Sequence, residues 1–569
     1  MLPHSIALSY RTIYPPIPTL KFLAAALLGM FTLVCQPAVN AQTSSESRDL
    51  PGIMVRTIAQ FQDSTQRSFS TGEPVYQPEL IKDFYVQRGY APVWLVGRYV
   101  PARASEFAGC LKSISHANGL NSTHYHRHAI DEQLMLAAEN KETTPLETLI
   151  TLELLLTDAY LQLGTHLQSG AVNPEKLDIA WKPMRTALNI PLYLLQTLQS
   201  NTNLCESLQA LEPQQPEYKQ LKQLLNNFEQ QPEWGKLTAK WNLLLQKGDY
   251  SPLVIDLRKR LQLSGELSPD APMTDYFDKE LETAVMLFQR RHGLYYDGLV
   301  RSNVMNELNV SPQHRLAQIK ANLERWRWAP DTWGSTYVLV NLPDYRLTMF
   351  ENGQKTYSEL IIVGRENYPT PIFADTITYL VFNPYWYMPA SIAKNELMKE
   401  VDYDTNYFIN NDIKVFKGNK SINPATVNWQ KVDLSQYYFR QGASAFNPMG
   451  LVKFMFPNAY DIYIHDTPSK DLFNNSRRSY SHGCVRVNNP LGLASHLLQF
   501  DPTWNEKRIA DVIHSQKETT VKLKTPIPIY LVYYSAFIDP DTNEVNFRED
   551  LYSWDKKIAE LLDQNPIKE

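Results

Sequence analysis

The sequence has no excess of positive charge, because its 55 Lys and Arg residues are outnumbered by 60 Asp and Glu residues, for a net charge of −5. It therefore lacks the basic footprint that nucleic-acid-binding proteins carry. After its N-terminal segment it also lacks any apolar run of the about 20 residues that a membrane span requires. With 569 residues, 43% hydrophobic and 20% charged, the chain is expected to fold into two to four domains.

The first 41 residues are ordered like a secretory signal peptide. Arg11 and Lys21 precede the apolar run Phe22–Val34, and the small-residue site Val39-Asn40-Ala41 leads into a polar stretch. This run is short for a membrane span, and an uncleaved signal-anchor is the alternative. Lipidation at Cys35 is disfavoured, because the residue before it is not small. The segment predicts export.

Cysteines are few, and loss of the N-terminal segment would leave three, Cys110, Cys205 and Cys484. An odd number in an exported chain indicates at least one free, reactive thiol. Cys110 and Cys205 either pair in an oxidising compartment or are buried free thiols within helices. In both cases Cys484 is the odd cysteine.

Hydrophobic periodicity predicts an α+β multidomain fold. Residues 55–248 are expected to form a helical scaffold domain, since apolar residues recur with a period near 3.6, as in Leu146–Leu163. A connecting helix is predicted at 311–330. Residues 336–540 contain β-rich runs, interrupted at about 393–443 by a polar, Tyr-rich segment that we interpret as an inserted lid, with a passive surface excursion as the alternative. Residues 541–569 are expected to form a C-terminal tail.

Two further segments bear on binding. His124, His126 and His128 alternate in sequence, but no cysteine or carboxylate cluster accompanies them, so a surface loop is favoured over a metal site. Residues 251–309 show the apolar helix faces and the Asp297-Gly298 turn of a three-helix unit. This unit resembles the peptidoglycan-binding module, although Arg301-Ser302-Asn303 replaces the usual Gly-x-Thr. A generic helical bundle is the alternative.

The sharpest chemical signal lies between Ile462 and Val487. His465 ends a predicted strand and is followed, after 15 residues, by Ser481-His482-Gly483-Cys484-Val485-Arg486. A cysteine attacks as the thiolate, and a neighbouring imidazole is its usual activator. Gly483 permits a tight turn beside the nucleophile, and backbone N–H groups around it could bind an oxyanion. A zinc site made of His465, His482 and Cys484 is the alternative that these residue types allow.

The pattern His-x15-Ser-His-Gly-Cys-Val-Arg resembles the signature of the L,D-transpeptidase family, also called the YkuD domain. Phe382–Trp386, Asn447–Gly450 and Lys453–Asn458 match this family as well. The resemblance covers roughly residues 250–540 and is strongest to a large Gram-negative branch with a helical region and a peptidoglycan-binding module. Many members have Gly after the histidine, where Asp466 stands here.

The resemblance implies Cys484 as the nucleophile and His465 as its base, with the backbone carbonyl of Asp466 orienting the imidazole. The Asp466 side chain is expected to point away from His465, because neighbours on a strand face opposite sides; a Cys-His-Asp triad is the alternative. The remaining site residues implied are a nucleophile loop of Ser481, His482, Gly483 and Arg486, and a substrate groove of Tyr385, Trp386 and Tyr387. Arg486 would contact a carboxylate or form a structural salt bridge.

The implied activity is formation of 3→3 peptidoglycan cross-links through a cysteine thioester, with release of D-Ala from a tetrapeptide stem. A hydrolase of the same family, acting as an L,D-carboxypeptidase, and a non-catalytic peptidoglycan-binding scaffold are the alternatives. No metal or organic cofactor is implied. The expected partners are peptidoglycan stem peptides and cell-wall synthases, not nucleic acid. The expected location is the periplasm or cell envelope of a Gram-negative bacterium, with a role in cell-wall organisation and cell shape.

Overall fold

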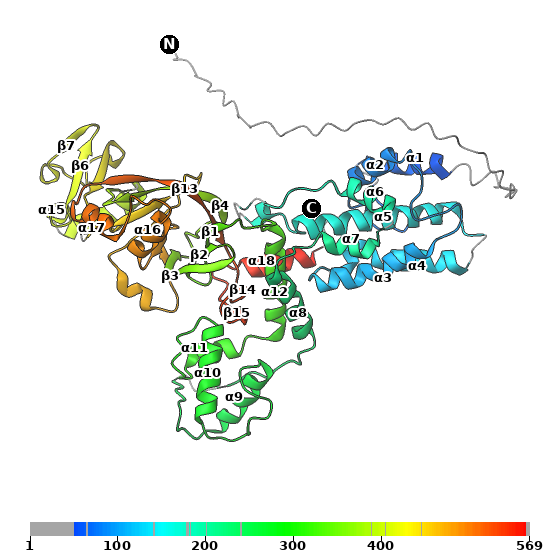
Figure 1. The fold of residues 1–569 in the computed structure, drawn as a ribbon, viewed down its shortest axis with the longest axis horizontal. Helices are drawn as coiled ribbons and strands as arrows, with labels where there is room; N and C mark the ends of the chain where they lie inside the picture. The colour runs from blue at the N-terminus through cyan, green and yellow to red at the C-terminus, as the bar shows by residue number, and fades with distance from the viewer. Residues whose placement is uncertain are drawn as a thin grey trace, which may run out of the picture. The chain divides into compact units, whose positions relative to one another are not determined.

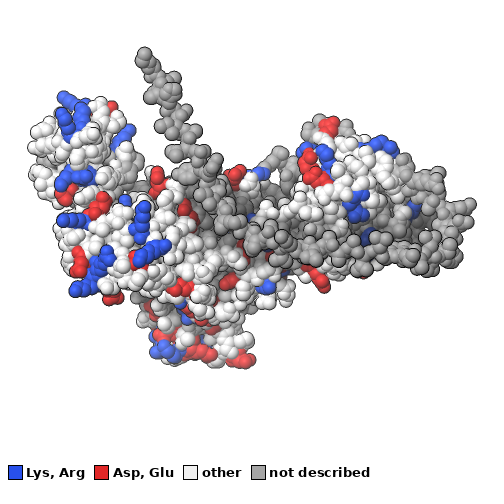
Figure 2. Space-filling view, turned by 45° about the horizontal axis from the view of Figure 1, so that its top comes forward, with Lys and Arg blue, Asp and Glu red and all other residues white. Residues whose placement is uncertain are grey.

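The computed structural model describes residues 50–63, 67–139, 143–177, 181, 184–200, 202–238, 242–388, 390–403, 406–444 and 446–564. The predicted signal peptide or signal-anchor, 1–41, lies outside these residues. Within them, no helix is both long and apolar enough to cross a membrane. On the face drawn in Figure 2, Lys and Arg side chains are interspersed with Asp and Glu side chains, as the near balance of charges leads one to expect.

The N-terminal helical region is built around α5 (Leu146–Ser169), in which every residue from Leu149 to Gly164 is buried. A helix that is apolar on nearly all sides must lie inside its domain, and other helices of the region surround it (Figure 1). These helices are α1 (Leu50–Gln60), α2 (Pro78–Gln87), α3 (Ala102–Ala117), α4 (Arg127–Glu139), α6 (Ile190–Gln199) and α7 (Leu204–Ala210), followed by α8 (Pro216–Glu229).

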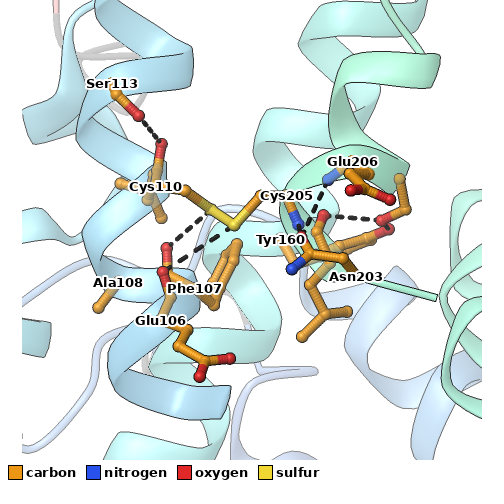
Figure 3. The surroundings of a disulfide bond; sticks show 12 residues. Glu106, Phe107, Ala108, Cys110, Ser113, Tyr160, Asn203, Cys205 and Glu206 are labelled. Carbon is orange, nitrogen blue, oxygen red and sulfur yellow. Dashed lines mark hydrogen bonds between the residues drawn. A yellow bond between two sulfur atoms is a disulfide. The ribbon is translucent and has the colours of Figure 1, made fainter. Parts of the chain in front are cut away.

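A disulfide joins Cys110 on α3 to Cys205 on α7, with the two Cα atoms 6.0 Å apart (Figure 3). Of the two alternatives left open by the sequence, pairing is therefore the one that the structure contains. Cys484 is the free cysteine of the described chain.

The segment of three histidines is not simply a surface loop, because His126 at its centre is fully buried. Its Nε2 lies 2.9 Å from Oδ2 of Asp158, and its Nδ1 lies 3.1 Å from Oε2 of Glu73. The sequence could not show this arrangement, since the carboxylates come from distant parts of the chain. Among the residues that the structure describes, no three His, Cys, Asp or Glu side chains are placed to hold a metal ion.

The module at 251–309 has its own apolar core, formed by residues such as Leu257, Phe288 and Val304. Its helices are α9 (Pro252–Leu263), α10 (Lys279–Arg291) and α11 (Ser302–Leu308). The connecting helix α12 (Pro312–Trp328) follows and packs against α5 and α8 of the scaffold.

The end of the chain is folded rather than a tail. Residues after 532 form β14 (Ala536–Ile538), β15 (Val545–Phe547) and α18 (Trp554–Asp563). Helix α18 lies beside α12 (Figure 1), and an ion pair between Arg325 and Asp555 joins the two helices. The prediction of a tail failed because the short strands pair only with each other and α18 depends on α12 for its burial.

The β-rich region contains a nine-stranded sheet in the order β11-β3-β12-β10-β9-β4-β13-β1-β2. Because β3 pairs with β2 as well as with β12, the sheet closes on itself. Its strands are β1 (Thr336–Asn341), β2 (Arg346–Glu351), β3 (Gln354–Gly364), β4 (Phe373–Phe382), β9 (Val452–Met455), β10 (Ile464–His465), β11 (Ser479–Ser481), β12 (Val485–Val487) and β13 (Thr519–Val532). Helices α16 (Pro490–Leu498) and α17 (Glu506–His514) follow β12.

The predicted insertion is a small folded subdomain that begins before residue 393, at β5. A four-stranded sheet in the order β5-β8-β6-β7 forms it together with short helices, and Phe408, Val415 and Phe439 belong to its separate core. Its elements are β5 (Trp386–Tyr387), α13 (Ala390–Ile392), α14 (Met398–Tyr403), α15 (Tyr407–Asn410), β6 (Ile413–Lys417), β7 (Lys420–Ile422) and β8 (Tyr437–Gln441).

Candidate active site

Cys484 lies on the short loop between β11 and β12 and is half-buried. The preceding Gly483 has φ +115°, and a Cβ atom there would come within 3.3 Å of Cδ1 of Ile462. Glycine is therefore favoured at this position, where the chain turns to present the thiol. The Cys484 thiol donates a weak hydrogen bond to the carbonyl of Asp461, with Sγ and oxygen 3.7 Å apart.

Two hydroxyl groups hold this loop. Oγ of Ser481 donates to the carbonyl of Cys484 at 2.5 Å and accepts the N–H of Gly483 at 3.1 Å. Oγ1 of Thr370 donates to the carbonyl of Gly483 at 2.6 Å and accepts the N–H of Gly364 at 2.9 Å. The Gly483 N–H is thus engaged within the loop. Thr370 was missed by the sequence analysis, since it lies outside the Cys484 motif.

His465 ends β10, between β9 and β12, and its side chain is buried. Its Nδ1 lies 2.6 Å from the carbonyl oxygen of Asp466, the group expected to orient it. Lys453 and Arg486 are its neighbours on the paired strands. Burial, reinforced by the positive charge of Arg486, lowers the pKa of His465 to about 3. The imidazole is therefore neutral at physiological pH.

The carboxylate of Asp466 is used for structure. Its Oδ2 accepts the N–H of Leu451 at 2.8 Å, and its Oδ1 accepts the N–H of Thr467 at 2.7 Å. Lys470 forms an ion pair with it at 2.7 Å. The arrangement supports the backbone role of Asp466 over a Cys-His-Asp triad.

Strands β10 and β12 are parallel and pair Ile464 with Val485. Cys484, one residue earlier, is therefore next to Tyr463, on the side of the sheet that also carries His465. The rings of Tyr463 and His465 lie 5.6 Å apart. Within the described part of the chain, no direct hydrogen bond joins Sγ of Cys484 to the imidazole, so the two residues are related by the pairing of their strands and not by a side-chain contact.

The electrostatics favour a neutral thiol before substrate binds. Burial raises the pKa of Cys484 above its ordinary value, although hydrogen bonds from Tyr463 and the charge of Arg486 oppose this effect. Burial also lowers the pKa of Lys453, whose Nζ lies 5.7 Å from the centre of the Tyr463 ring. Tyr463 and Lys453 were not identified as site residues from sequence; the only available signal was their position beside or within segments that match the family.

His482 contacts Arg365 and Tyr368. It is exposed, and its Nε2 lies 2.8 Å from Nη2 of Arg365. Its ring also lies 5.2 Å from that of Tyr368. The sequence reading did not include Arg365. In the described part of the chain, His465, His482 and Cys484 do not form a cluster of three side chains placed to hold a metal ion.

Tyr385, Trp386 and Tyr387 lie where the barrel strand β4 leads into the inserted subdomain. Trp386 and Tyr387 form β5 and pair with Gln441 and Arg440 of β8. The guanidinium of Arg440 lies 4.8 Å from the centre of the Tyr385 ring, while Tyr387 is exposed. These residues thus form the base of the insertion.

The fold and site define a multidomain α+β protein with a free cysteine on a β-barrel loop. Three family models match it: "Scaffold domain" at residues 79–225, "Putative peptidoglycan binding domain" at 250–308, and "L,D-transpeptidase catalytic domain", the YkuD model, at 335–529. The chain therefore carries the catalytic domain of the L,D-transpeptidase family, joined to a scaffold domain and a peptidoglycan-binding domain.

A protein of Haemophilus influenzae named "Putative L,D-transpeptidase" is 31% identical over 242 residues, which are 42% of this chain and 48% of that protein. The chain thus spans about half the length of the curated relative it matches. Among solved structures, an L,D-transpeptidase from Xylanimonas cellulosilytica has 13% identity and a TM-score of 0.17, over 52% of this chain and 99% of that one. One from Mycobacterium smegmatis has 13% identity and a TM-score of 0.17, over 35% of this chain and 58% of that one. TM-scores this low do not establish a shared fold.

Proposed function

We propose that this protein is an L,D-transpeptidase that forms 3→3 cross-links between peptidoglycan stem peptides through a thioester on Cys484. The observation that carries the proposal is the place of Cys484 in the YkuD domain, on a glycine-containing loop that leads into the strand paired with that of His465. The neighbouring peptidoglycan-binding domain supports the same substrate.

In the first step, Sγ of Cys484 attacks the carbonyl carbon of the L-centre of diaminopimelate in a tetrapeptide stem. His465 accepts the thiol proton and returns it to the departing amine of D-Ala. The hydrogen bond from Nδ1 to the Asp466 carbonyl leaves Nε2 as the basic nitrogen. The substrate is proposed to align thiol and imidazole, since catalytic hydrogen bonds often tighten only in the complex. With the Gly483 N–H engaged by Ser481, we assign the N–H of Cys484 to the oxyanion.

In the second step, the amine of another stem attacks the thioester. His465 takes the proton of this amine, a C–N bond forms, the C–S bond breaks, and the thiol recovers its proton. Water would instead release a tripeptide, so the site must exclude it. We propose that Tyr385, Trp386 and Tyr387 line the donor groove and that the inserted subdomain covers it.

The proposed cellular location and protein partners follow from this function. The N-terminal signal-like segment supports export to the periplasm, with or without retention as a membrane anchor. The peptidoglycan-binding domain would hold the enzyme on its polymeric substrate. Cell-wall synthases, which supply new stems, are the proposed protein partners.

Mass spectrometry of the full chain mixed with disaccharide tetrapeptides tests this function. The expected results are a tripeptidyl adduct on Cys484 and a cross-linked dimer formed with loss of D-Ala. The Cys484→Ala variant should give neither product and should unfold at the same temperature as the wild type. Free tripeptide without dimer would identify a carboxypeptidase instead, and normal cross-linking by Cys484→Ala would refute the catalytic assignment.

A further inference from the structure

The exposed residue Arg365 forms hydrogen bonds with the loop that carries the candidate nucleophile. Arg365 directly follows β3, and its backbone N–H donates to the carbonyl of Ser481 at 3.0 Å. Its guanidinium reaches His482, the residue two positions before Cys484, with Nη2 and Nε2 2.8 Å apart. The position of this cation relative to the thiol is thereby set by both backbone and side chain.

The guanidinium of Arg365 lies over the ring of Tyr368, which favours one orientation of the side chain. The guanidinium carbon lies 4.7 Å from the centre of the Tyr368 ring, and Tyr368 donates its N–H to the Arg365 carbonyl at 2.8 Å, which closes a turn. Because arginine is only a donor, Nε2 of His482 accepts this hydrogen bond.

Arg365 differs from the arginines that hold the fold together. Arg325, Arg315 and Arg548 each form an ion pair with a carboxylate, whereas no carboxylate of the described chain lies within ion-pair distance of Arg365. An exposed, oriented guanidinium beside a nucleophile offers two parallel N–H donors, the geometry that carboxylates accept.

We infer that Arg365, supported by His482 and Tyr368, is a specificity-determining residue that binds a free carboxylate of the donor stem peptide. The inference rests on the proposed function. Successive Cα atoms are about 3.8 Å apart, so the Cα atoms of His482 and Cys484 are at most about 7.6 Å apart. We therefore expect a group bound beside His482 to belong to the residue that Cys484 attacks or to one next to it. The two carboxylates of the stem nearest to that carbonyl are the terminal carboxylate of D-Ala and the carboxylate of the D-centre of diaminopimelate.

Steady-state kinetics with three donor stems tests the inference. One stem has both carboxylates free, one ends in D-alaninamide, and one has the diaminopimelate carboxylate amidated. A hydrogen bond to a charged group is worth about 1.5–3 kcal/mol, so Arg365→Gln should raise KM for the free stem by about ten- to a hundredfold, and Arg365→Lys by less. The amidated stem on which Arg365→Gln and wild type become equal identifies the bound carboxylate.

Arg508 offers a matched control, because it is also exposed and its guanidinium carbon lies 4.5 Å from the centre of a Trp504 ring. Arg508→Gln should leave KM unchanged for every stem. An equal loss by Arg365→Gln on all three stems, or no loss at all, would overturn the inference.

A binding measurement separates this inference from the proposed function. Calorimetry with Cys484→Ala and Cys484→Ala/Arg365→Gln proteins needs no turnover. Adding the arginine change should weaken binding of the free stem and of one amidated stem, and should leave unchanged the stem whose Arg365-bound carboxylate is amidated. A wild-type enzyme that makes neither thioester nor product refutes the proposed function, whereas an active enzyme indifferent to Arg365 refutes only the carboxylate site.

Discussion

Nδ1 of His465 lies 2.6 Å from the carbonyl oxygen of Asp466, so a backbone group and not a carboxylate orients the imidazole. The Asp466 side chain instead accepts the backbone N–H groups of Leu451 and Thr467. Because a carbonyl can only accept, the proton of the neutral ring resides on Nδ1 and Nε2 carries the lone pair.

The Asp466→Asn variant distinguishes this arrangement from a triad. An amide can still accept one of the two N–H groups but loses the ion pair with Lys470, so we expect stability to fall by about 1–2 kcal/mol and kcat to stay within about tenfold. In a true triad, the same change costs about 10⁴ in kcat. Urea unfolding and kcat for cross-linking are the measurements, and a loss of that size would show that the carboxylate acts on the imidazole.

The pH dependence of kcat/KM reports the protonation of Cys484 and His465. Burial and the charge of Arg486 lower the pKa of His465 to about 3, and burial raises the pKa of Cys484. Activity should therefore stay level from pH 8 down to about pH 5, where an imidazole of ordinary pKa near 6.5 would already have lost most of its basic form. Arg486→Gln removes a cation beside His465 and should move the acidic limb to higher pH. A wild-type acidic limb near pH 6.5 would contradict a buried neutral base.

Acid should destabilise the scaffold through His166. Burial lowers the pKa of His166 to about 3, and its Nδ1 lies 2.9 Å from the hydroxyl oxygen of Tyr125. The folded pKa is below the unfolded value of about 6.5, so stability is complete above pH 6.5 and falls by about 1.4 kcal/mol per pH unit between pH 6.5 and pH 3. His166→Gln should reduce the slope of unfolding free energy against pH by that amount, measured in urea from pH 7 to pH 4. An unchanged slope would mean that His166 is protonated in the folded protein.

The C-terminal segment should support the nucleophile loop. The Tyr552 hydroxyl donates to the Gly364 carbonyl at 2.7 Å and accepts the Thr370 N–H at 3.3 Å, and Thr370 in turn holds the Gly483 carbonyl. Thr370→Val should lower kcat by about tenfold, since a misplaced reacting group is costly, and Thr370→Ser should restore it. Tyr552→Phe should have a smaller effect in the same direction. Full activity in Thr370→Val would show that the loop holds its shape without this hydrogen bond.

The disulfide between Cys110 and Cys205 spans 95 residues of sequence. Disulfides typically stabilise by about 2–4 kcal/mol, chiefly by restricting the unfolded chain. The Cys110→Ser/Cys205→Ser protein should lose that much in urea unfolding, and dithiothreitol should lower the wild type to the same level. Its kcat should equal that of the wild type, because the bond joins two scaffold helices. A stability that reductant leaves unchanged would contradict this account.

Several features of the protein follow from the sequence alone, because they depend on local pattern. Helical periodicity predicted the central scaffold helix and the three helices of the module at 251–309, and the spacing from His465 to Cys484 indicated the family before any fold was known. These signals are local, since burial of one helix face repeats every 3.6 residues and a motif lies within one stretch of chain.

Tertiary structure alone decided which distant residues meet. Thr370 donates a hydrogen bond to the Gly483 carbonyl, and Arg365 donates one to His482. Glu73 and Asp158 pair with His126, and α18 packs against α12. A sequence pattern specifies that a residue is buried or polar, but the partner of a polar group depends on strand register and helix packing between segments far apart in the chain. The identity of the candidate nucleophile is therefore readable from the sequence, while the network that holds it is a property of the closed sheet.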